Sequence, residues 1–267
     1  MDNQSISRAL ELNLRPYAQT LQLEWQINYF EHPESGFASM SNGAERSHEL
    51  YYNYGYVTRT LRNPQSLGQF TPSNPETLGS LLHELCHLHL GEKVDVAFSG
   101  RRLSKKHESD GKNLDRKMGI FQLFDDPTID MWVNDVLFKN WPDIADARMA
   151  KYLESYRQYA LDGYPEYLIT TTIFFKLAQV QADRNRHGMK NIDLSEILNP
   201  LEASHPLQYG ALERLRGHLE KLPQLPSNRI DALNLYQSSV NDAMRLVGTD
   251  VKAGLIEEDG IQVWAFD

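Results

Sequence analysis

The stretch LGSLLHELCHLHLGE, residues 78–92, decides how the centre of this chain folds. Its leucines recur with the i, i+3, i+4, i+7 spacing of one helix face, which predicts a buried stripe made of Leu78, Leu81, Leu82, Leu85 and Leu88. Asn74 is typical of the residue that caps a helix, and Pro75 of the first helical position. Gly91 is typical of a helix end. The sequence therefore predicts a helix from Pro75 to about Gly91.

Two histidines and a glutamate lie on this predicted helix. His83 and His87 are four residues apart and share one face, so their Cβ atoms lie about 5–6 Å apart. Two imidazoles at this spacing can bind one tetrahedral zinc ion (Zn²⁺) at about 2.0–2.1 Å each. Glu84 is rotated about 100° from His83, which suits a general base for a metal-bound water better than a third ligand. This H-E-x-x-H pattern predicts a hydrolytic zinc site, and an amphipathic helix with ordinary histidines is the alternative.

The segment SLLHELCHL resembles the active-site helix of the zincin metallopeptidases, in particular their gluzincin branches. The resemblance covers residues 74–92 and 126–138. It implies a peptide or protein substrate, attack of metal-activated water on the peptide bond, and Glu84 as general base. It also implies a sheet-edge strand that aligns the substrate, for which residues 49–61 are the candidate. Gly79, one turn before His83, would leave an open face beside the metal.

The third zinc ligand is expected in FDDPTIDMWVNDVLF, residues 124–138. Asp126 and Pro127 predict a helix start, because they fit the capping and first helical positions. Asp130 and Asn134 then share one face. In the thermolysin-like zincins a carboxylate on a second helix completes the site, and an Asp or Asn one turn later supports a histidine. Asp130 is therefore the expected ligand, and Asn134 the residue that orients a histidine.

Other residues remain open for these roles. Asp126 and His107 are alternative third ligands. His205, followed by Pro206, resembles a His-Pro element of some gluzincins, which makes it a candidate donor to the oxyanion; its alternative is a loop histidine before a helix. Cys86 lies off the histidine face and is expected to be a small buried hydrophobe.

The expected fold class is α+β and zincin-like: a small N-terminal sheet packed on the H-E-x-x-H helix, followed by a mainly helical second half. A first helix is expected at 5–21, extended segments at 21–31 and 49–61, and loops at 32–47 and 62–76. Further helices are predicted at 127–140, 143–162, 165–186, 207–222 and 228–247, and a terminal hairpin at 256–266. We expect one domain over 1–267, with a possible helical subdomain from about 143 to 250.

Composition limits the classes of partner. Of the 267 residues, 41% are hydrophobic, and the net charge is −9. An acidic chain gains no electrostatic advantage on nucleic acid or anionic membranes, so neither is expected as a partner. No run approaches the roughly 18 apolar residues of a membrane helix, and the N-terminus has no signal-peptide pattern. The single cysteine excludes an internal disulfide. Together these features predict a cytoplasmic protein.

The sequence thus predicts a zinc metallopeptidase-like hydrolase with His83, His87 and Asp130 as ligands and Glu84 as base. Two other classes remain: a non-catalytic zincin-fold regulator or binding module, and a zinc amidohydrolase acting on a non-peptide amide.

Overall fold

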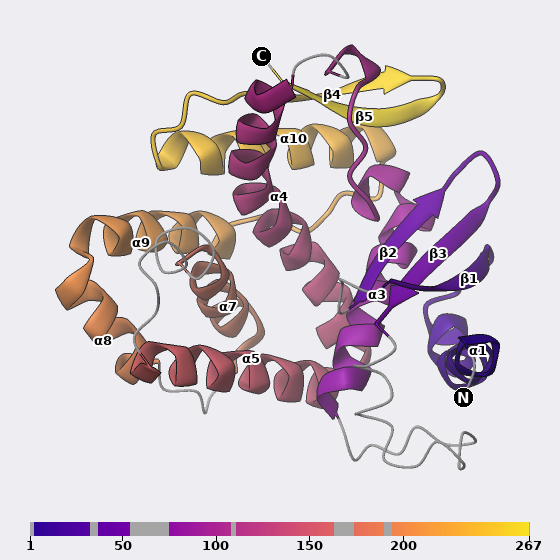
Figure 1. The fold of residues 1–267 in the computed structure, drawn as a ribbon, viewed down its shortest axis with the longest axis horizontal. Helices are drawn as coiled ribbons and strands as arrows, with labels where there is room; N and C mark the ends of the chain where they lie inside the picture. Colours follow the sequence, from indigo (N-terminus) through magenta and orange to yellow (C-terminus); the bar gives the residue numbers. More distant parts are fainter. Residues whose placement is uncertain are drawn as a thin grey trace. The chain divides into compact units, whose positions relative to one another are not determined.

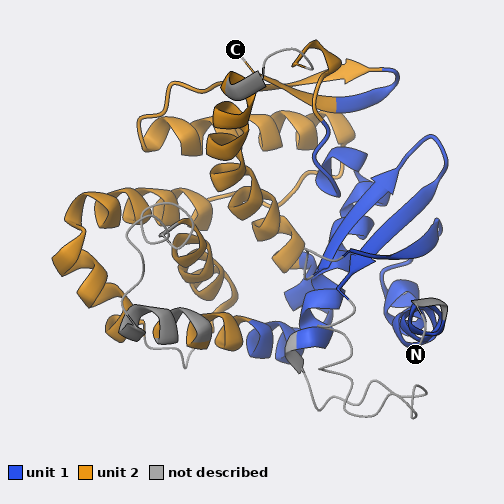
Figure 2. Cartoon of the chain, in the orientation of Figure 1, with its two compact units in different colours: residues 1–102, 136–148, 259–262 blue, residues 103–135, 149–258, 263–267 orange. Residues whose placement is uncertain are grey.

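The computed structural model describes residues 3–32, 37–53, 75–107, 111–162, 174–189 and 194–266. Within these ranges the fold is α+β, with eight α-helices, a sheet of three strands and a sheet of two (Figure 1). The chain divides into two compact units (Figure 2). The first unit contains residues 1–102, 136–148 and 259–262, and the second contains 103–135, 149–258 and 263–267. Among the described helices, none combines the length and apolar character that a membrane crossing requires.

The first unit is built on a three-stranded sheet of β1 (Gln26–Glu31), β2 (Phe37–Asn42) and β3 (Ser47–Tyr52). The strand order is β1-β3-β2, with β1 parallel and β2 antiparallel to β3. The extended character predicted for 21–31 and 49–61 is confirmed at β1 and β3, while residues 54–61 lie outside the described chain. The expectation that 49–61 supplies an edge strand is wrong for β3, because β3 is central and β2 lies at an edge.

β2 lies where the sequence predicted only loop. Its residues FASMSN have little intrinsic strand propensity, so the strand depends on its surroundings. Leu50 of β3, which pairs with Ser39 of β2, is fully buried, and the helix α3 packs against β2. Small serines on the strand allow this close packing. Asn42 starts the turn to β3, since its side chain accepts a hydrogen bond from the Ala44 backbone N–H at 3.2 Å.

Helix α3 spans Pro75–Lys93, and α1 spans Asn3–Thr20 beside β1. The predicted start at Pro75 is confirmed, and Asn74 lies outside the described residues. Nearly the whole circumference of α3 is covered, including the predicted stripe and Cys86. A helix buried on all sides belongs to the core. The histidine helix is therefore the central element of the first unit, flanked by β2 and by the short 3₁₀ helix η1 (Val96–Phe98).

The prediction that Gly91 ends the helix is wrong, because α3 continues to Lys93. Gly91 serves close packing instead. A Cβ atom there would lie 2.3 Å from Ser99 Oγ and 2.5 Å from Ser41 Oγ. The absence of a side chain lets β2 and the residues after η1 approach the helix.

Gly91→Ala is expected to destabilise the protein by about 1–3 kcal/mol, the usual cost of forcing extra volume into a packed site. Helix propensity alone would favour alanine by about 1 kcal/mol, so the steric clash must outweigh it. Gly119→Ala is the matched control: Gly119 is exposed within a helix and a Cβ there meets nothing within 4 Å. Chemical denaturation should show opposite signs for the two variants, and equal stabilisation by both would contradict this account.

A buried hydrogen-bond network ties the end of α3 to the sheet. His48 on β3 lies 2.8 Å from Ser41 Oγ through Nδ1 and 3.0 Å from Glu92 Oε2 through Nε2. Burial lowers the pKa of His48 despite the neighbouring carboxylate. Burial would raise the pKa of Glu92, but hydrogen bonds from Lys93, the Trp25 backbone N–H and His48 outweigh it and lower the pKa to about 2. His48 is therefore neutral and Glu92 ionised.

This network predicts that the free energy of unfolding falls as the pH is lowered below about 6.5. Both groups have lower pKa values folded than unfolded, so the unfolded chain binds more protons and stability rises with pH. His48 lowers the free energy of unfolding as the pH falls below 6.5, the usual pKa of histidine. Glu92 lowers it further as the pH falls from its usual pKa of 4.5 to about 2. Denaturation midpoints of wild type and His48→Gln across pH 4–8 measure the effect. The same change of midpoint with pH in wild type and His48→Gln would contradict the role of His48. His32→Asn, at an exposed histidine, is the control and should depend on pH as wild type does.

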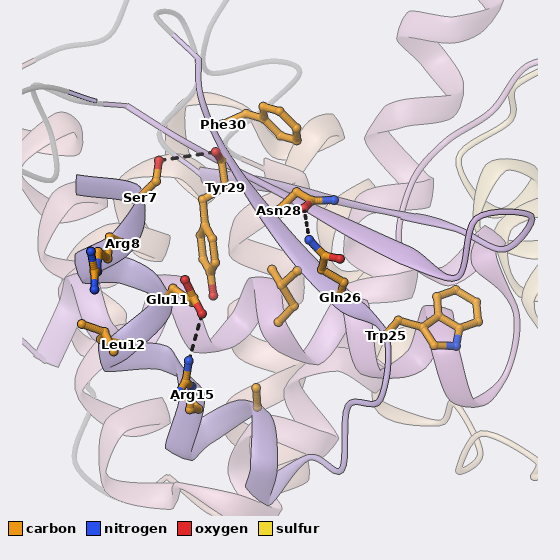
Figure 3. Close-up of a pocket in the computed structure, with 12 residues that line it drawn as sticks. Ser7, Arg8, Glu11, Leu12, Arg15, Trp25, Gln26, Asn28, Tyr29 and Phe30 are labelled. Carbon is orange, nitrogen blue, oxygen red and sulfur yellow. Dashed lines mark hydrogen bonds and ion pairs between the residues drawn. The ribbon is translucent and has the colours of Figure 1, made fainter. Parts of the chain in front are cut away.

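An open groove lies between α1 and β1 (Figure 3). Helix α1 lines it with Ser7, Glu11 and Arg15, and β1 with Asn28 and Tyr29. Glu11 and Arg15 form an ion pair at 2.9 Å along the helix. None of the residues predicted for the zinc site lines this groove.

The second unit is mainly helical. Its helices are η2 (Lys105–His107), α7 (Phe174–His187), α8 (Ser195–Ser204), α9 (Pro206–Glu220) and α10 (Arg229–Leu246), with most of α4 (Gly111–Asn140) and α5 (Pro142–Asp162). The helices predicted at 143–162, 207–222 and 228–247 are confirmed within two residues. For the helix predicted at 165–186, α7 covers the second half, and residues 163–173 lie outside the described chain. Helix α8 was not predicted.

The terminal hairpin is confirmed as β4 (Ala253–Glu258) and β5 (Ile261–Phe266). Asp259 and Gly260 both have positive φ, at 52° and 79°, as the two-residue turn of a tight hairpin requires. The hairpin contributes Trp264 to an aromatic core, where its ring centroid lies 4.7 Å from that of Phe121 and 5.2 Å from that of Tyr236.

Candidate metal centre

His83 and His87 form a close pair on α3. They are one helical turn apart, and their ring centroids are separated by 4.9 Å with an angle of 85° between the planes. His83 is buried and His87 half-buried. The leucines packed around the same helix fix its rotation, so both rings stay on one side. This arrangement has the spacing that a single tetrahedral metal requires from two imidazoles.

The orientation of His87 is set by the segment that follows α3. Its Nδ1 lies 3.1 Å from the carbonyl oxygen of Phe98, which can only accept, so Nδ1 carries the proton and donates it. Nε2 therefore carries the lone pair. Asp95 in turn caps η1 by accepting from the Ala97 N–H at 2.9 Å, which holds the Phe98 carbonyl in place. Metal-binding histidines usually make such a bond through the nitrogen that does not bind the metal.

Glu84 is held by the edge strand. Ser39 Oγ on β2 donates to Glu84 Oε2 at 2.8 Å, and the carboxylate is half-buried. This contact fixes one carboxylate oxygen of Glu84. The arrangement suits a carboxylate that accepts a proton through Oε1.

The space beside Gly79 is filled, so the expectation of an open face there is wrong. A Cβ at Gly79 would lie 2.9 Å from Cβ of Arg148, a residue of α5 whose side chain is buried along α3. Arg148 also brings positive charge near Cys86, whose thiol has a strongly raised pKa because burial outweighs that charge. The thiol is fully buried and protonated, as expected of a packing residue.

Asp130 lies on α4 in the second unit and is buried. Its Oδ2 accepts hydrogen bonds from Lys176 Nζ at 3.2 Å and from Gln179 Nε2 at 3.1 Å. Both donors come from α7. Asn134, one turn after Asp130, donates through Nδ2 to Asp183 Oδ2 at 2.7 Å. The expected role of Asn134 in orienting a histidine stays a prediction.

The helix start predicted at Asp126 and Pro127 is wrong, because α4 begins at Gly111 and passes through Pro127. Proline inside a helix costs about 3 kcal/mol or more. Buried side chains on both sides of it, Phe124 and Ile129 among them, keep the helix continuous. Asp126 is therefore not a capping residue.

The other candidates have their own partners in the second unit. His107 is buried, and its Nε2 accepts the Phe266 backbone N–H at 2.9 Å, so this nitrogen is already engaged. His205 links α8 to α9 and contacts Ser204 Oγ through Nδ1 at 2.7 Å. The role of His107 as a ligand and that of His205 as an oxyanion donor stay predictions.

The sequence did not indicate Ser39, the Phe98 carbonyl, Lys176 or Gln179. A signal exists for the last two. The segment KLAQVQAD sets polar residues at positions i, i+3 and i+7 among apolar ones, which indicates a polar stripe on a buried helix. Nothing in the sequence pairs that stripe with Asp130. Ser39 and Phe98 have no local signal at all.

Comparisons with known proteins leave the family open. No family model matches this chain, and no match was found among curated proteins or among solved structures.

Proposed function

We propose that this chain is a zinc-dependent hydrolase of the zincin type that cleaves peptide bonds, with His83, His87 and Asp130 as ligands and Glu84 as general base. The observation that carries the proposal is the close His83–His87 pair, in which His87 donates a hydrogen bond to the Phe98 carbonyl. That bond leaves Nε2 of His87 with the lone pair a metal needs.

The chemistry of the donor set fits zinc. Two neutral imidazoles and one carboxylate are the ligands of many catalytic zinc sites. His83, His87 and Asp130 form a group of side chains that could hold a metal ion, each offering one ligand atom. When bound, zinc would polarise the scissile carbonyl and acidify water.

The residues of the chain divide the remaining work. Glu84 Oε1 takes a proton from the attacking water and later gives it to the leaving amine. Ser39 holds Oε2, so that the carboxylate does not rotate during the transfer. The hydrogen bond to the Phe98 carbonyl keeps the proton of His87 on Nδ1, so that Nε2 is left for the metal. These contacts reduce the reorganisation that the reaction would otherwise require.

A peptide substrate would lie along β2. This strand is at the edge of the sheet in the described chain, and its Ser39 contacts the proposed base. An extended peptide adds to such an edge through main-chain hydrogen bonds. The substrate-aligning role that the resemblance implied for residues 49–61 is therefore proposed for β2.

Metal analysis and cleavage assays on the purified protein test the proposal. We expect about one zinc per chain, hydrolysis of a mixture of fluorescence-quenched peptides, and loss of hydrolysis after chelation that zinc reverses. A protein that takes up no zinc contradicts the proposal. Zinc uptake without peptide turnover would favour a binding module, and turnover of small amides alone would favour an amidohydrolase.

A further inference from the structure

Two side chains of α7 hold the carboxylate of Asp130. Lys176 Nζ and Gln179 Nε2 both donate to the same oxygen, Oδ2, at 3.2 and 3.1 Å. Lys176 also donates to Gln179 Oε1 at 3.2 Å, which closes a ring of three contacts. Lys176 and Gln179 are three residues apart on one helix, so one face of α7 supplies both donors. These contacts fix the orientation of the Asp130 carboxylate.

The cluster is well shielded. The side chain of Asp130 is 10% exposed and Gln179 is buried, while Lys176 is 34% exposed and reaches in from the surface. A buried carboxylate loses much of its hydration, and donors to one oxygen compensate for that loss. In such surroundings hydrogen bonds restrict the rotation of the carboxylate group more than they would in water.

We propose that Lys176 and Gln179 are positioning residues that fix the orientation of the Asp130 carboxylate and favour its binding to the metal through a single oxygen. The inference rests on the proposed zinc site. With two donors on Oδ2, a metal that took both oxygens would have to displace them. Asp130 therefore serves as a one-oxygen ligand, which preserves a four-coordinate site with a position for water.

The same two helices offer a matched control. Asp135, farther along α4, is paired with Arg186 of α7 through contacts of 2.7 and 2.6 Å. This pair joins the same helices by the same kind of interaction but does not touch Asp130. Arg186→Met therefore tests the stability of the helix pair without disturbing the carboxylate at the proposed site.

The experiment measures zinc affinity, by competition with a chromophoric chelator, and the visible spectrum of the cobalt-substituted protein. Lys176→Met and Gln179→Met are expected to weaken zinc binding about 10- to 100-fold, the usual effect of losing a partner of a metal ligand. Cobalt absorption should also lose intensity, because two-oxygen binding raises the coordination number. Lys176→Arg should restore both properties, since its guanidinium can donate to Oδ2, and Arg186→Met should match wild type.

The outcomes separate the two proposals. If wild type binds zinc and cleaves peptides but both methionine variants keep its affinity and cobalt spectrum, the positioning role is wrong and the proposed function stands. If wild type binds no metal, both are wrong. Circular dichroism checks that each variant is folded, and Lys176→Arg provides the comparison if Lys176→Met does not fold.

Discussion

Glu84→Gln is expected to retain zinc and to lower the rate of peptide hydrolysis by about 10²–10⁴-fold, the range that a positioned general base contributes. Glutamine has the same shape as glutamate and can still accept the hydrogen bond from Ser39 Oγ, so the contact between α3 and β2 should survive. It cannot take a proton from water at neutral pH. The loss should appear in kcat more than in KM, because only the proton transfer is affected.

Glu45→Gln is the control for this variant. Glu45 is an exposed carboxylate at the turn between β2 and β3, and the same chemical change there should leave zinc content and turnover unchanged. Hydrolysis by Glu84→Gln at the wild-type rate would remove Glu84 from the reaction. Loss of zinc by Glu84→Gln would instead assign the residue to metal binding.

His87→Asn is expected to weaken zinc binding by more than about 100-fold and to abolish peptide hydrolysis. The asparagine amide can replace Nδ1 as donor to the Phe98 carbonyl, but no atom replaces Nε2. Loss of a partner of a metal ligand already costs about 10- to 100-fold in affinity, so loss of a direct ligand should cost more. Chelator competition and metal analysis after dialysis measure the change.

The matched control is His89→Asn. His89 lies on the same helix, and its Nδ1 donates to the Leu21 carbonyl at 2.9 Å, so the same substitution preserves the corresponding bond. His89 is expected to have no part in metal binding, and its variant should bind zinc like wild type. Equal loss of zinc in both variants would mean that the effect comes from damage to α3, and would contradict the assignment of His87.

Helices and turns whose own residues have the right spacing or capping chemistry could be predicted from the sequence. The leucine spacing predicted α3. Pro206 and Asn228 stand at the beginnings of α9 and α10, and Asp259-Gly260 has the chemistry of the turn in the terminal hairpin. β2 could not be predicted in this way, because its serines and alanine favour a strand only against α3 and β3. The start of α4 was misplaced because Asp126-Pro127 has the chemistry of a helix start, while buried neighbours on both sides sustain the helix.

The same distinction applies to the candidate site. His83, Glu84 and His87 were predictable because helix geometry alone sets their spacing. Their partners come from elsewhere: Ser39 from β2, the Phe98 carbonyl from η1, and for Asp130 the α7 residues Lys176 and Gln179. Glycine signals were misleading, since Gly79 and Gly91 permit close packing by Arg148 and Ser99. A sequence pattern does not distinguish a glycine that ends a helix from one that admits a neighbour.

The stacking of Trp25 on His48 has an optical consequence. Their ring centroids lie 5.2 Å apart with 27° between the planes, so the excited indole is in contact with the imidazole. A protonated imidazole accepts an electron from an excited indole and quenches its fluorescence, whereas a neutral one does so weakly. Emission that dims on acidification in wild type but not in Trp25→Phe would isolate this signal from the other three of the four tryptophans. The stack therefore provides an intrinsic fluorescent probe for the charge of a side chain that solvent does not reach.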